Sequence, residues 1–132
     1  MQRIKIFSRL KQAVSPQQSK DIGSYAEEIA TRYLKQQNIR VITKNFLCKL
    51  GEIDIIGTDN NTIIFFEVRY RKNHKHGSAA QSITYTKQKK VINTAQFWLK
   101  IHGYRNVNIR FDAILFDRHI DHQHLTWLKA AF

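Results

Sequence analysis

The sequence predicts a single α/β domain in which helices flank a central mixed β-sheet. Its hydrophobic pattern gives, in order, a helix, three strands, a second helix and one or two final strands. A helix that joins two strands is the signature of a crossover connection. With 132 residues, of which 42% are hydrophobic, the chain is long enough to bury roughly two-thirds of its unfolded surface in one core.

The net charge of the chain indicates which kind of molecule it binds. There are 22 Lys and Arg residues against ten Asp and Glu, and the formal net charge is +12. Such an excess predicts a polyanionic partner, first of all nucleic acid, with an anionic membrane surface as the competitor. No apolar run approaches the roughly 18 residues of a membrane span, and the N-terminus lacks the apolar core of a secretory signal. We therefore expect a basic cytoplasmic domain that binds nucleic acid and no membrane.

The first 20 residues are expected to form a basic, flexible extension that adds affinity for phosphates. A weak amphipathic helix is the alternative, because apolar residues recur at Ile4, Phe7, Leu10 and Val14. A strong helix is predicted over residues 21–38, with Ser24 as its N-cap and Glu27 at capping-box spacing. Glu27 lies at the edge of the apolar face of this helix, and capping alone would account for it.

Residues 39–46 are predicted to be a short strand, and residues 51–71 (GEIDIIGTDNNTIIFFEVRYR) a hairpin that carries the candidate site. With Asn60 and Asn61 as the two central turn residues, Asp54 faces Glu67 at a Cβ separation of about 5 Å. Two carboxylates so placed repel each other unless a cation compensates them. The structural alternative is an ion-pair network with a basic residue of the sheet, namely Arg69, Arg71 or Arg110.

After the hairpin comes a basic loop (KNHKHGSAAQS, residues 72–82), followed by a second predicted helix over residues 86–102. The helix has a predicted buried stripe that includes Lys87, Val91 and Trp98, while Lys89 and Lys90 lie off it. Strands are predicted over residues 107–116 and, as a strand or short element, over 124–132. The residues expected to contact nucleic acid are basic ones on the loop and this helix: Arg71, Lys72, Lys75, Lys87, Lys89 and Lys90.

Several motifs resemble one bacterial family. They are GSYAEEIATRYL (residues 23–34), GEIDII (51–56), FFEVRYR (65–71), QSI (81–83), KQKK (87–90), RFD (110–112) and the closing Ala131-Phe132. In order and spacing they resemble the YraN-like family over residues 21–132, which implies a single domain there. That family is similar in its predicted fold to the restriction-endonuclease-like superfamily, the PD-(D/E)XK nucleases that include Holliday-junction resolvases. The resemblance thus implies a three-layer fold, and a homodimer follows only by analogy with the resolvases.

By position, the resemblance implies that Glu27 is the helix glutamate of the superfamily and that Asp54 and Glu67 bind Mg²⁺ or Mn²⁺. The superfamily's lysine falls on Arg69, which is a departure from the pattern. Arginine stays protonated and cannot act as a base, although it can orient water and stabilise charge. If the lysine's role is electrostatic, Arg69 retains activity; if the role is proton transfer, another residue such as Lys87 must reach the site.

Three classes of function follow. The first is a metal-dependent endonuclease acting on DNA, with branched structures as candidate substrates. The second is a nuclease-derived module that binds DNA or RNA without efficient cleavage, and the third is an RNA-processing domain. A zinc site in the His-rich turn at residues 119–124 is not expected, because no CxxC accompanies it. Trp98 and Trp127 are expected in the core, which leaves Tyr70 and Tyr85 as the aromatic residues suited to contact nucleic acid.

Overall fold

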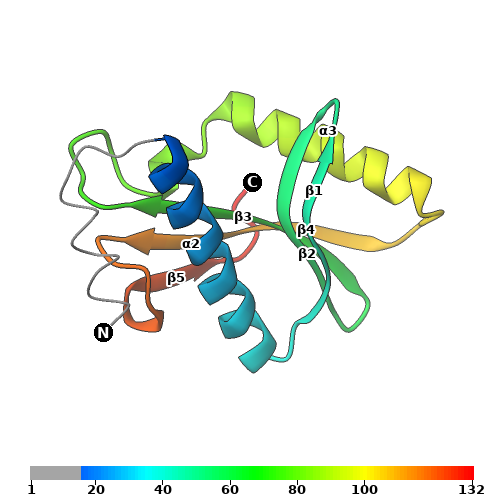
Figure 1. Cartoon of the computed structure of the whole chain (residues 1–132). Coiled ribbons are helices and arrows are strands. Elements are labelled where there is room, and N and C mark those ends of the chain that lie inside the picture. Colours follow the sequence, from blue (N-terminus) through cyan, green and yellow to red (C-terminus); the bar gives the residue numbers. More distant parts are fainter. Residues whose placement is uncertain (1–15) are drawn as a thin grey trace.

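The computed structural model describes residues 16–132, which form two long helices packed against a five-stranded sheet (Figure 1). The strands follow one another in space as they do in sequence, and β3 and β4 are parallel while the other neighbours are antiparallel. The predicted mixed sheet with flanking helices is therefore confirmed. The elements are α2 (Pro16–Gln36), β1 (Arg40–Cys48), β2 (Gly51–Asp59), β3 (Thr62–Arg71), α3 (Tyr85–Ile101), β4 (Asn108–Asp117) and β5 (Leu125–Leu128), with short 3₁₀ helices η1 (Ala80–Ser82) and η2 (His122–His124).

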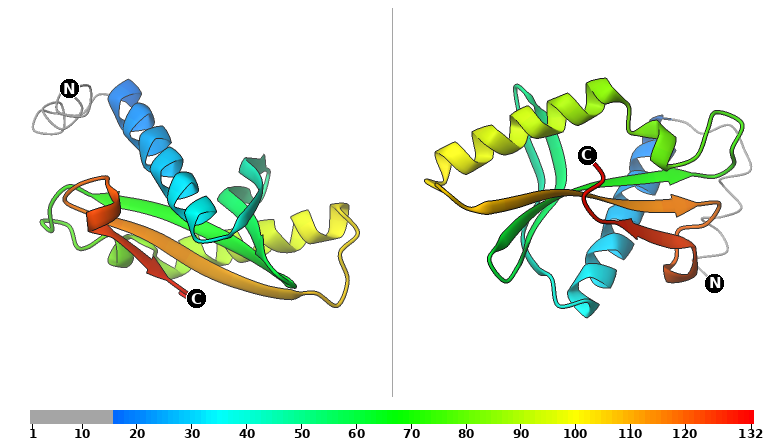
Figure 2. Two further views of the ribbon diagram at one scale, coloured as in Figure 1. Left: turned by 90° about the horizontal axis from the view of Figure 1, so that it is seen from below. Right: turned by 180° about the vertical axis from the view of Figure 1, so that it is seen from behind.

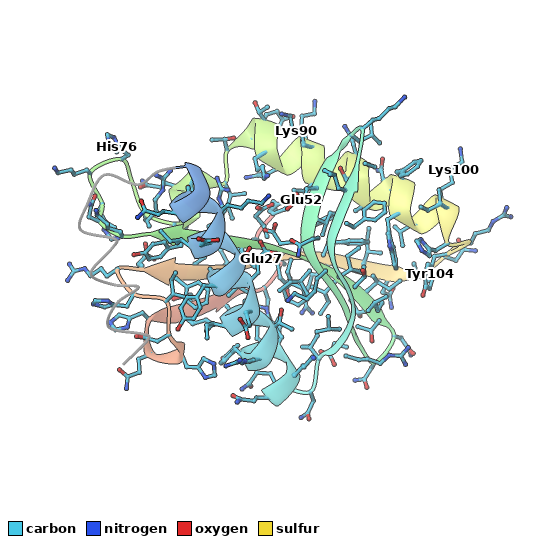
Figure 3. The ribbon with its side chains drawn as sticks, viewed as in Figure 1. Glu27, Glu52, His76, Lys90, Lys100 and Tyr104 are labelled. Carbon is cyan, nitrogen blue, oxygen red and sulfur yellow. The ribbon has the colours of Figure 1, made fainter. Side chains whose placement is uncertain are left out.

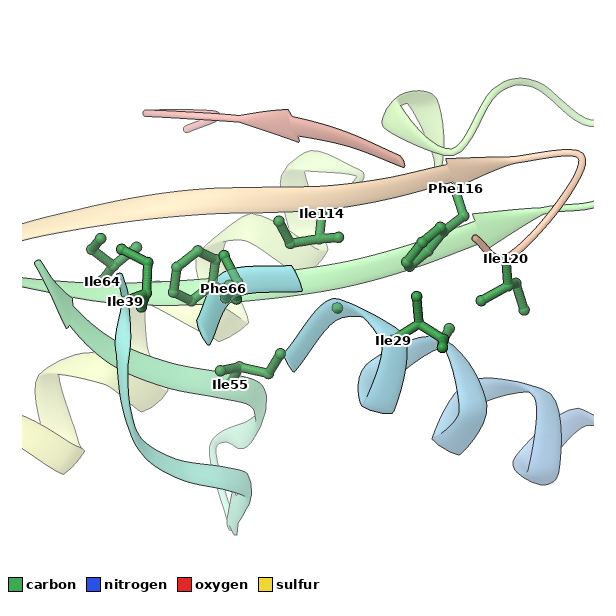
Figure 4. Packing of buried hydrophobic residues seen from close by; sticks show 11 residues of the cluster. Ile29, Ile39, Ile55, Ile64, Phe66, Ile114, Phe116 and Ile120 are labelled. Atoms are coloured by element: carbon green, nitrogen blue, oxygen red, sulfur yellow. The ribbon is translucent and has the colours of Figure 1, made fainter. Parts of the chain in front are cut away.

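The two helices cover opposite faces of the sheet (Figure 2). Successive residues of a strand point to alternate faces, and β3 is buried on both. Ile64 and Phe66 pack with Ile29 and its neighbours on α2, in the cluster of Figure 4. Phe65 packs instead against α3, where Trp98 meets it edge to face at a ring distance of 5.9 Å. The expectation that Trp98 belongs to the core is confirmed.

The first described helix, α2, spans Pro16–Gln36 and so includes residues 16–20, which the sequence analysis assigned to the flexible extension. Ser24 therefore lies inside the helix and is not its N-cap, so capping does not account for Glu27. Residues 16–20 are helical, and the rest of the predicted extension, including the alternative amphipathic helix, lies outside the described residues.

The hairpin turn is confirmed, because Asp59 pairs with Thr62 across Asn60 and Asn61. Asn60 has a φ of 53°, a left-handed conformation that asparagine tolerates better than most residues. The second helix is also close to its prediction: it starts one residue early, after Thr84 caps it by accepting a hydrogen bond from the backbone N–H of Lys87 at 3.2 Å. Within residues 16–132 no helix is long and apolar enough to cross a membrane.

A fully buried carboxylate, Asp112, ties β4 to the C-terminal segment. Its two oxygens accept hydrogen bonds from Arg110 Nε at 2.8 Å and Nη2 at 2.9 Å, a two-point contact. They also accept from Trp127 Nε1 and from the backbone N–H of Ala130, each at 2.9 Å. These hydrogen bonds satisfy the polar oxygens of a carboxyl group that is removed from water. The guanidinium of Arg110 therefore binds Asp112 through two of its nitrogens.

We predict that Asp112→Ala lowers the free energy of unfolding by about 3 kcal/mol, because it leaves the partly buried Arg110 unpaired and strands the N–H groups of Trp127 and Ala130. The matched control is Glu28→Ala. Glu28 pairs with Arg32 on the exposed surface of α2, and such a pair contributes about 0.5 kcal/mol or less. Urea denaturation followed by circular dichroism measures both variants, and equal losses would contradict the structural role given to Asp112.

Candidate functional site

Four carboxylates converge where β2 separates from β3. The two strands pair from Asp59↔Thr62 to Ile55↔Phe66, which is the register that the sequence predicts. Beyond that point lie Asp54 and Glu52 on β2 and Glu67 on β3, and Glu27 reaches them from α2. Figure 3 shows Glu27 and Glu52 in the middle of the molecule, between α2 and α3. The structure thus brings together the three acidic residues singled out in the sequence and adds Glu52.

Asp54 is the centre of the cluster. Its Oδ2 accepts a hydrogen bond from the backbone N–H of Val68 at 2.8 Å, so the side chain of β2 bonds to β3 just past the last backbone pair. The negative charge of Asp54 raises the pKa of each of the other three carboxyl groups. The remaining acidic residues are therefore organised around this single side chain.

Burial is the largest cause of each of these pKa shifts. It raises the pKa of Glu27 from 4.5 to about 7, with the charges of Asp54 and then Glu52 adding to the effect. Burial likewise holds the pKa of Glu67 well above its ordinary value, with the charge of Asp54 second. The pKa of Glu52 is raised by burial and then by Asp54. Nearby cations lower these pKa values, but by less than burial and the neighbouring carboxylates raise them.

Three of the carboxylates are close enough to share an ion. Glu27, Glu52 and Asp54 each offer an oxygen that lies within 4.8 Å of the other two. Among residues 16–132, Glu27 Oε1 is the one buried side-chain oxygen or nitrogen with no hydrogen-bond partner. Carboxylate oxygens are the ligands that Mg²⁺ and Mn²⁺ prefer. Within the described part of the chain, no other group of three or more acidic, His or Cys side chains is arranged to hold a metal.

Two cations face Glu67. Arg69 Nη1 lies 4.0 Å and Lys87 Nζ 3.8 Å from the same oxygen, Glu67 Oε1. Arg69 is also held from the other side, because its Nε donates to Ser82 Oγ at 2.9 Å and its Nη2 to the Ser82 carbonyl at 3.1 Å. Lys87 is thus the residue that reaches the site from α3, as the sequence analysis required of any substitute for the missing lysine.

The ion-pair alternative holds for one of its three candidate residues. Arg110 is bound to Asp112 instead, and the guanidinium of Arg71 has no ion-pair partner among the residues described. Only Arg69 lies beside the acidic cluster, at a distance that is long for an ion pair. The three carboxylates closest to one another, Glu27, Glu52 and Asp54, have no Arg partner at all within the described chain.

The remaining basic residues predicted to bind nucleic acid lie in two places. Lys72 and Lys75 follow Arg71 on the exposed loop after β3, and Lys89 and Lys90 are exposed on α3. Lys89 lies over the ring of Tyr85. The His-rich turn is a surface feature: His124 Nδ1 contacts Asp121 Oδ1 at 2.7 Å, and the rings of His119 and His124 pack against each other.

Two functional neighbours were missed in the sequence analysis. Glu52 carried a signal, because it shares a strand face with Asp54. Its backbone passes close to α3, since a Cβ added at Gly51 would lie 3.0 Å from Thr94 Oγ1, so a larger residue there would push Glu52 away. Ser82 lies in the QSI motif of the resemblance, but its contact with Arg69 depends on how η1 folds back.

We predict that Asp54→Asn raises the free energy of unfolding of the metal-free protein by about 1 kcal/mol at pH 8, and by much less at pH 5. A carboxyl group whose pKa is raised on folding stabilises the fold below its unfolded pKa, and this contribution is lost as the pH rises through about 7. Removing the charge of Asp54 weakens that loss, while an asparagine oxygen can still accept from Val68. Urea denaturation in EDTA at the two pH values measures the free energy of unfolding, with Asp59→Asn as the control variant. Asp59 lies on the same strand beside the turn, so an equal gain there would contradict this explanation.

The comparison with known proteins gives the family of the chain. Residues 26–116 match the model of the uncharacterised protein family UPF0102. A UPF0102 protein of Marinomonas sp. (strain MWYL1) is 51% identical over 113 residues, which cover 86% of this chain and 89% of the relative. UPF0102 proteins of Vibrio campbellii and Vibrio cholerae are 41% and 39% identical, covering 85% and 86% of this chain and 92% and 93% of the relatives. The chain belongs to the UPF0102 family.

Proposed function

We propose that this protein is a metal-dependent endonuclease of the PD-(D/E)XK type that hydrolyses phosphodiester bonds in DNA. The observation that carries the proposal is the convergence of four carboxylates from α2, β2 and β3 beside Lys87 and Arg69, in a chain of formal net charge +12. Acidic groups whose pKa is raised by burial and by a neighbouring charge are candidates for a functional site when they lie in one cluster. The basic surface supplies attraction for a polyanion that the acidic cluster alone would repel.

The proposal is also supported by the helix and strands on which the motif residues lie. The resemblance implies a restriction-endonuclease-like fold, and the helices on opposite faces of a mixed sheet agree with a three-layer arrangement. The motif residues come from the elements that this fold requires: Glu27 from the first helix, Asp54 from a strand that ends its pairing, and Glu67 and Arg69 from the next strand.

The residues present fit a hard divalent cation. All the donors are carboxylate oxygens, and Glu27 Oε1 is buried without a partner. Glu27, Glu52 and Asp54 would hold Mg²⁺ or Mn²⁺, with Glu67 beside Asp54 as a further ligand. Bound there, the ion supplies Lewis acidity that polarises the phosphate and lowers the pKa of water.

Lys87 and Arg69 divide the role that one lysine plays in the superfamily. Ser82 holds the guanidinium of Arg69 at two points, so this group is preorganised to orient the scissile phosphate and stabilise its developing charge. Lys87 is about one-third exposed, and its Nζ lies beside Glu67. It supplies a second positive charge that can follow the substrate. Arg71, Lys72, Lys75, Lys89 and Lys90 then contact phosphates further along the backbone.

The second candidate function is a nuclease-derived module that binds DNA or RNA without efficient cleavage. It is favoured by Arg69, which stands at the lysine position and is already bonded to Ser82. Both functions require salt-sensitive binding, since counterions leave the phosphates that basic residues contact. They differ in the need for a metal. A homodimer stays a prediction by analogy with junction resolvases, which cut two strands symmetrically.

We predict cleavage of labelled DNA in Mg²⁺ or Mn²⁺ and none in EDTA. Single-stranded, duplex, flap and four-way-junction substrates are compared on denaturing gels. Asp54→Asn and Glu67→Gln should each lower the rate at least about a hundredfold, because each removes a charge from the site that would hold the metal. Asp59→Asn, on the same strand but beside the turn, serves as the control. Salt-sensitive binding without cleavage in either metal would replace the nuclease with the binding module.

We further predict that Lys87→Met lowers the cleavage rate by about 10- to 100-fold and leaves binding in EDTA within about threefold of the original, because Lys87 acts on charge that develops during the reaction. Lys87→Arg should retain part of the rate. Lys100→Met, at the far end of α3 (Figure 3), is the matched control. If Lys87→Met cleaves normally while Arg69→Lys accelerates cleavage, the role belongs to position 69 alone.

A further inference from the structure

A basic groove lies along the end of β3, between this strand and α2. It consists of two cavities of about 280 and 340 Å³ that share Ser19 and Ile22 of α2 and Tyr70 and Arg71 of β3 in their walls. Because the walls are shared, the two cavities form one continuous depression. We name it the α2–β3 groove.

The inner end of the α2–β3 groove is lined by residues that contact the candidate site. Its walls there include Val68, Arg69 and Ser82. The backbone N–H of Val68 binds Asp54, and the guanidinium of Arg69 lies between Ser82 and Glu67. A chain of phosphates that leaves the acidic cluster on this side would therefore enter the groove directly.

The groove is positively charged along its length. Its described lining includes Arg69, Arg71, Lys72 and His76 and contains no Asp or Glu. Arg71 is half-buried, yet its side chain has no ion-pair or hydrogen-bond partner among residues 16–132. A half-buried cation without a carboxylate partner is suited to an anion from outside the chain.

The size and the aromatic wall of the α2–β3 groove suit a single strand. Cavities of a few hundred Å³ hold ligands of about nucleotide size. A DNA duplex is too wide to enter cavities of this volume. Tyr70 lines both cavities while it packs beside the core under α2, and its hydroxyl donates to the carbonyl of Arg118 at 3.1 Å. Proteins bind single strands with this combination of a basic groove and an aromatic face on which a base stacks.

We propose that the α2–β3 groove binds one unpaired nucleic-acid strand that continues from the acidic cluster. The inference deepens the proposed function, because it assigns single-stranded or frayed segments as the part of the substrate held beside the site. The groove makes its contacts to phosphates and a base face, so it acts without a metal. Its occupation is measurable in EDTA, where the acidic cluster contributes only repulsion.

The test is fluorescence anisotropy in EDTA with a labelled 12-nucleotide DNA strand, the same strand in RNA, and the DNA as a duplex. We expect Arg71→Ala to weaken binding of a single strand by about tenfold and to lower the slope of log K against log salt by about 0.7, the value for one lost phosphate contact. Arg71→Lys should recover part of the affinity. The duplex should be affected less than about threefold.

Arg105→Ala is the matched control, since Arg105 is exposed in the connection between α3 and β4, near the labelled Tyr104 and far from the labelled His76 (Figure 3). It removes the same charge and should change strand binding less than about twofold. The proposal would be overturned if Arg71→Ala and Arg105→Ala lost equal affinity for the single strand. It would also be overturned if Arg71→Ala lost equal affinity for the single strand and the duplex. Because no cleavage is measured, an inactive protein can still support the groove, and an active one can still contradict it.

Discussion

The architecture of the site depends on one hydrogen bond, from the backbone N–H of Val68 to Asp54 Oδ2. It takes the place of the next backbone pair after Ile55↔Phe66, so β2 can leave β3 without stranding that donor. In a continued ladder, the sheet would separate side chains of the α2 face from those of the α3 face. Where the strands part, Glu27 from one face and Lys87 from the other can both approach Asp54 and its neighbours.

Two kinds of buried carboxylate show what this arrangement costs. Asp112 receives four hydrogen bonds, two of them from Arg110, so its oxygens are fully partnered and its role is to hold the C-terminal segment. Glu27 keeps a buried oxygen with no partner within the described chain, and Glu67 faces two cations at 3.8 and 4.0 Å. Unmatched acids destabilise a fold, and proteins retain such strain at sites where a ligand relieves it.

Local rules were enough to predict the hairpin and its acidic pair. Strand alternation and the Asn60-Asn61 turn fix the register, and the register places Asp54 opposite Glu67. The start of α2 was mispredicted because Ser24 is a residue type that suits an N-cap, although it lies within the helix. Glu52 shares a strand face with Asp54, but its approach to Glu27 depends on how α2 packs against the sheet, which strand alternation does not give. The contact of Ser82 with Arg69 joins residues that no periodicity relates, so no pattern in the sequence could have revealed it.

The position of Arg69 links the acidic cluster to the α2–β3 groove. Two nitrogens of its guanidinium bind Ser82, the third faces Glu67, and the residue lines the inner cavity. A lysine has a single charged nitrogen and lacks the planar fork with which Arg69 contacts Ser82 at two points and Glu67 at a third. Arginine at this position therefore does more than replace a charge, because it joins the loop after β3 to the site. Lys87, in the first turn of α3, adds a second cation 3.8 Å from Glu67, so the acidic cluster does not depend on Arg69 alone for positive charge while Ser82 holds Arg69.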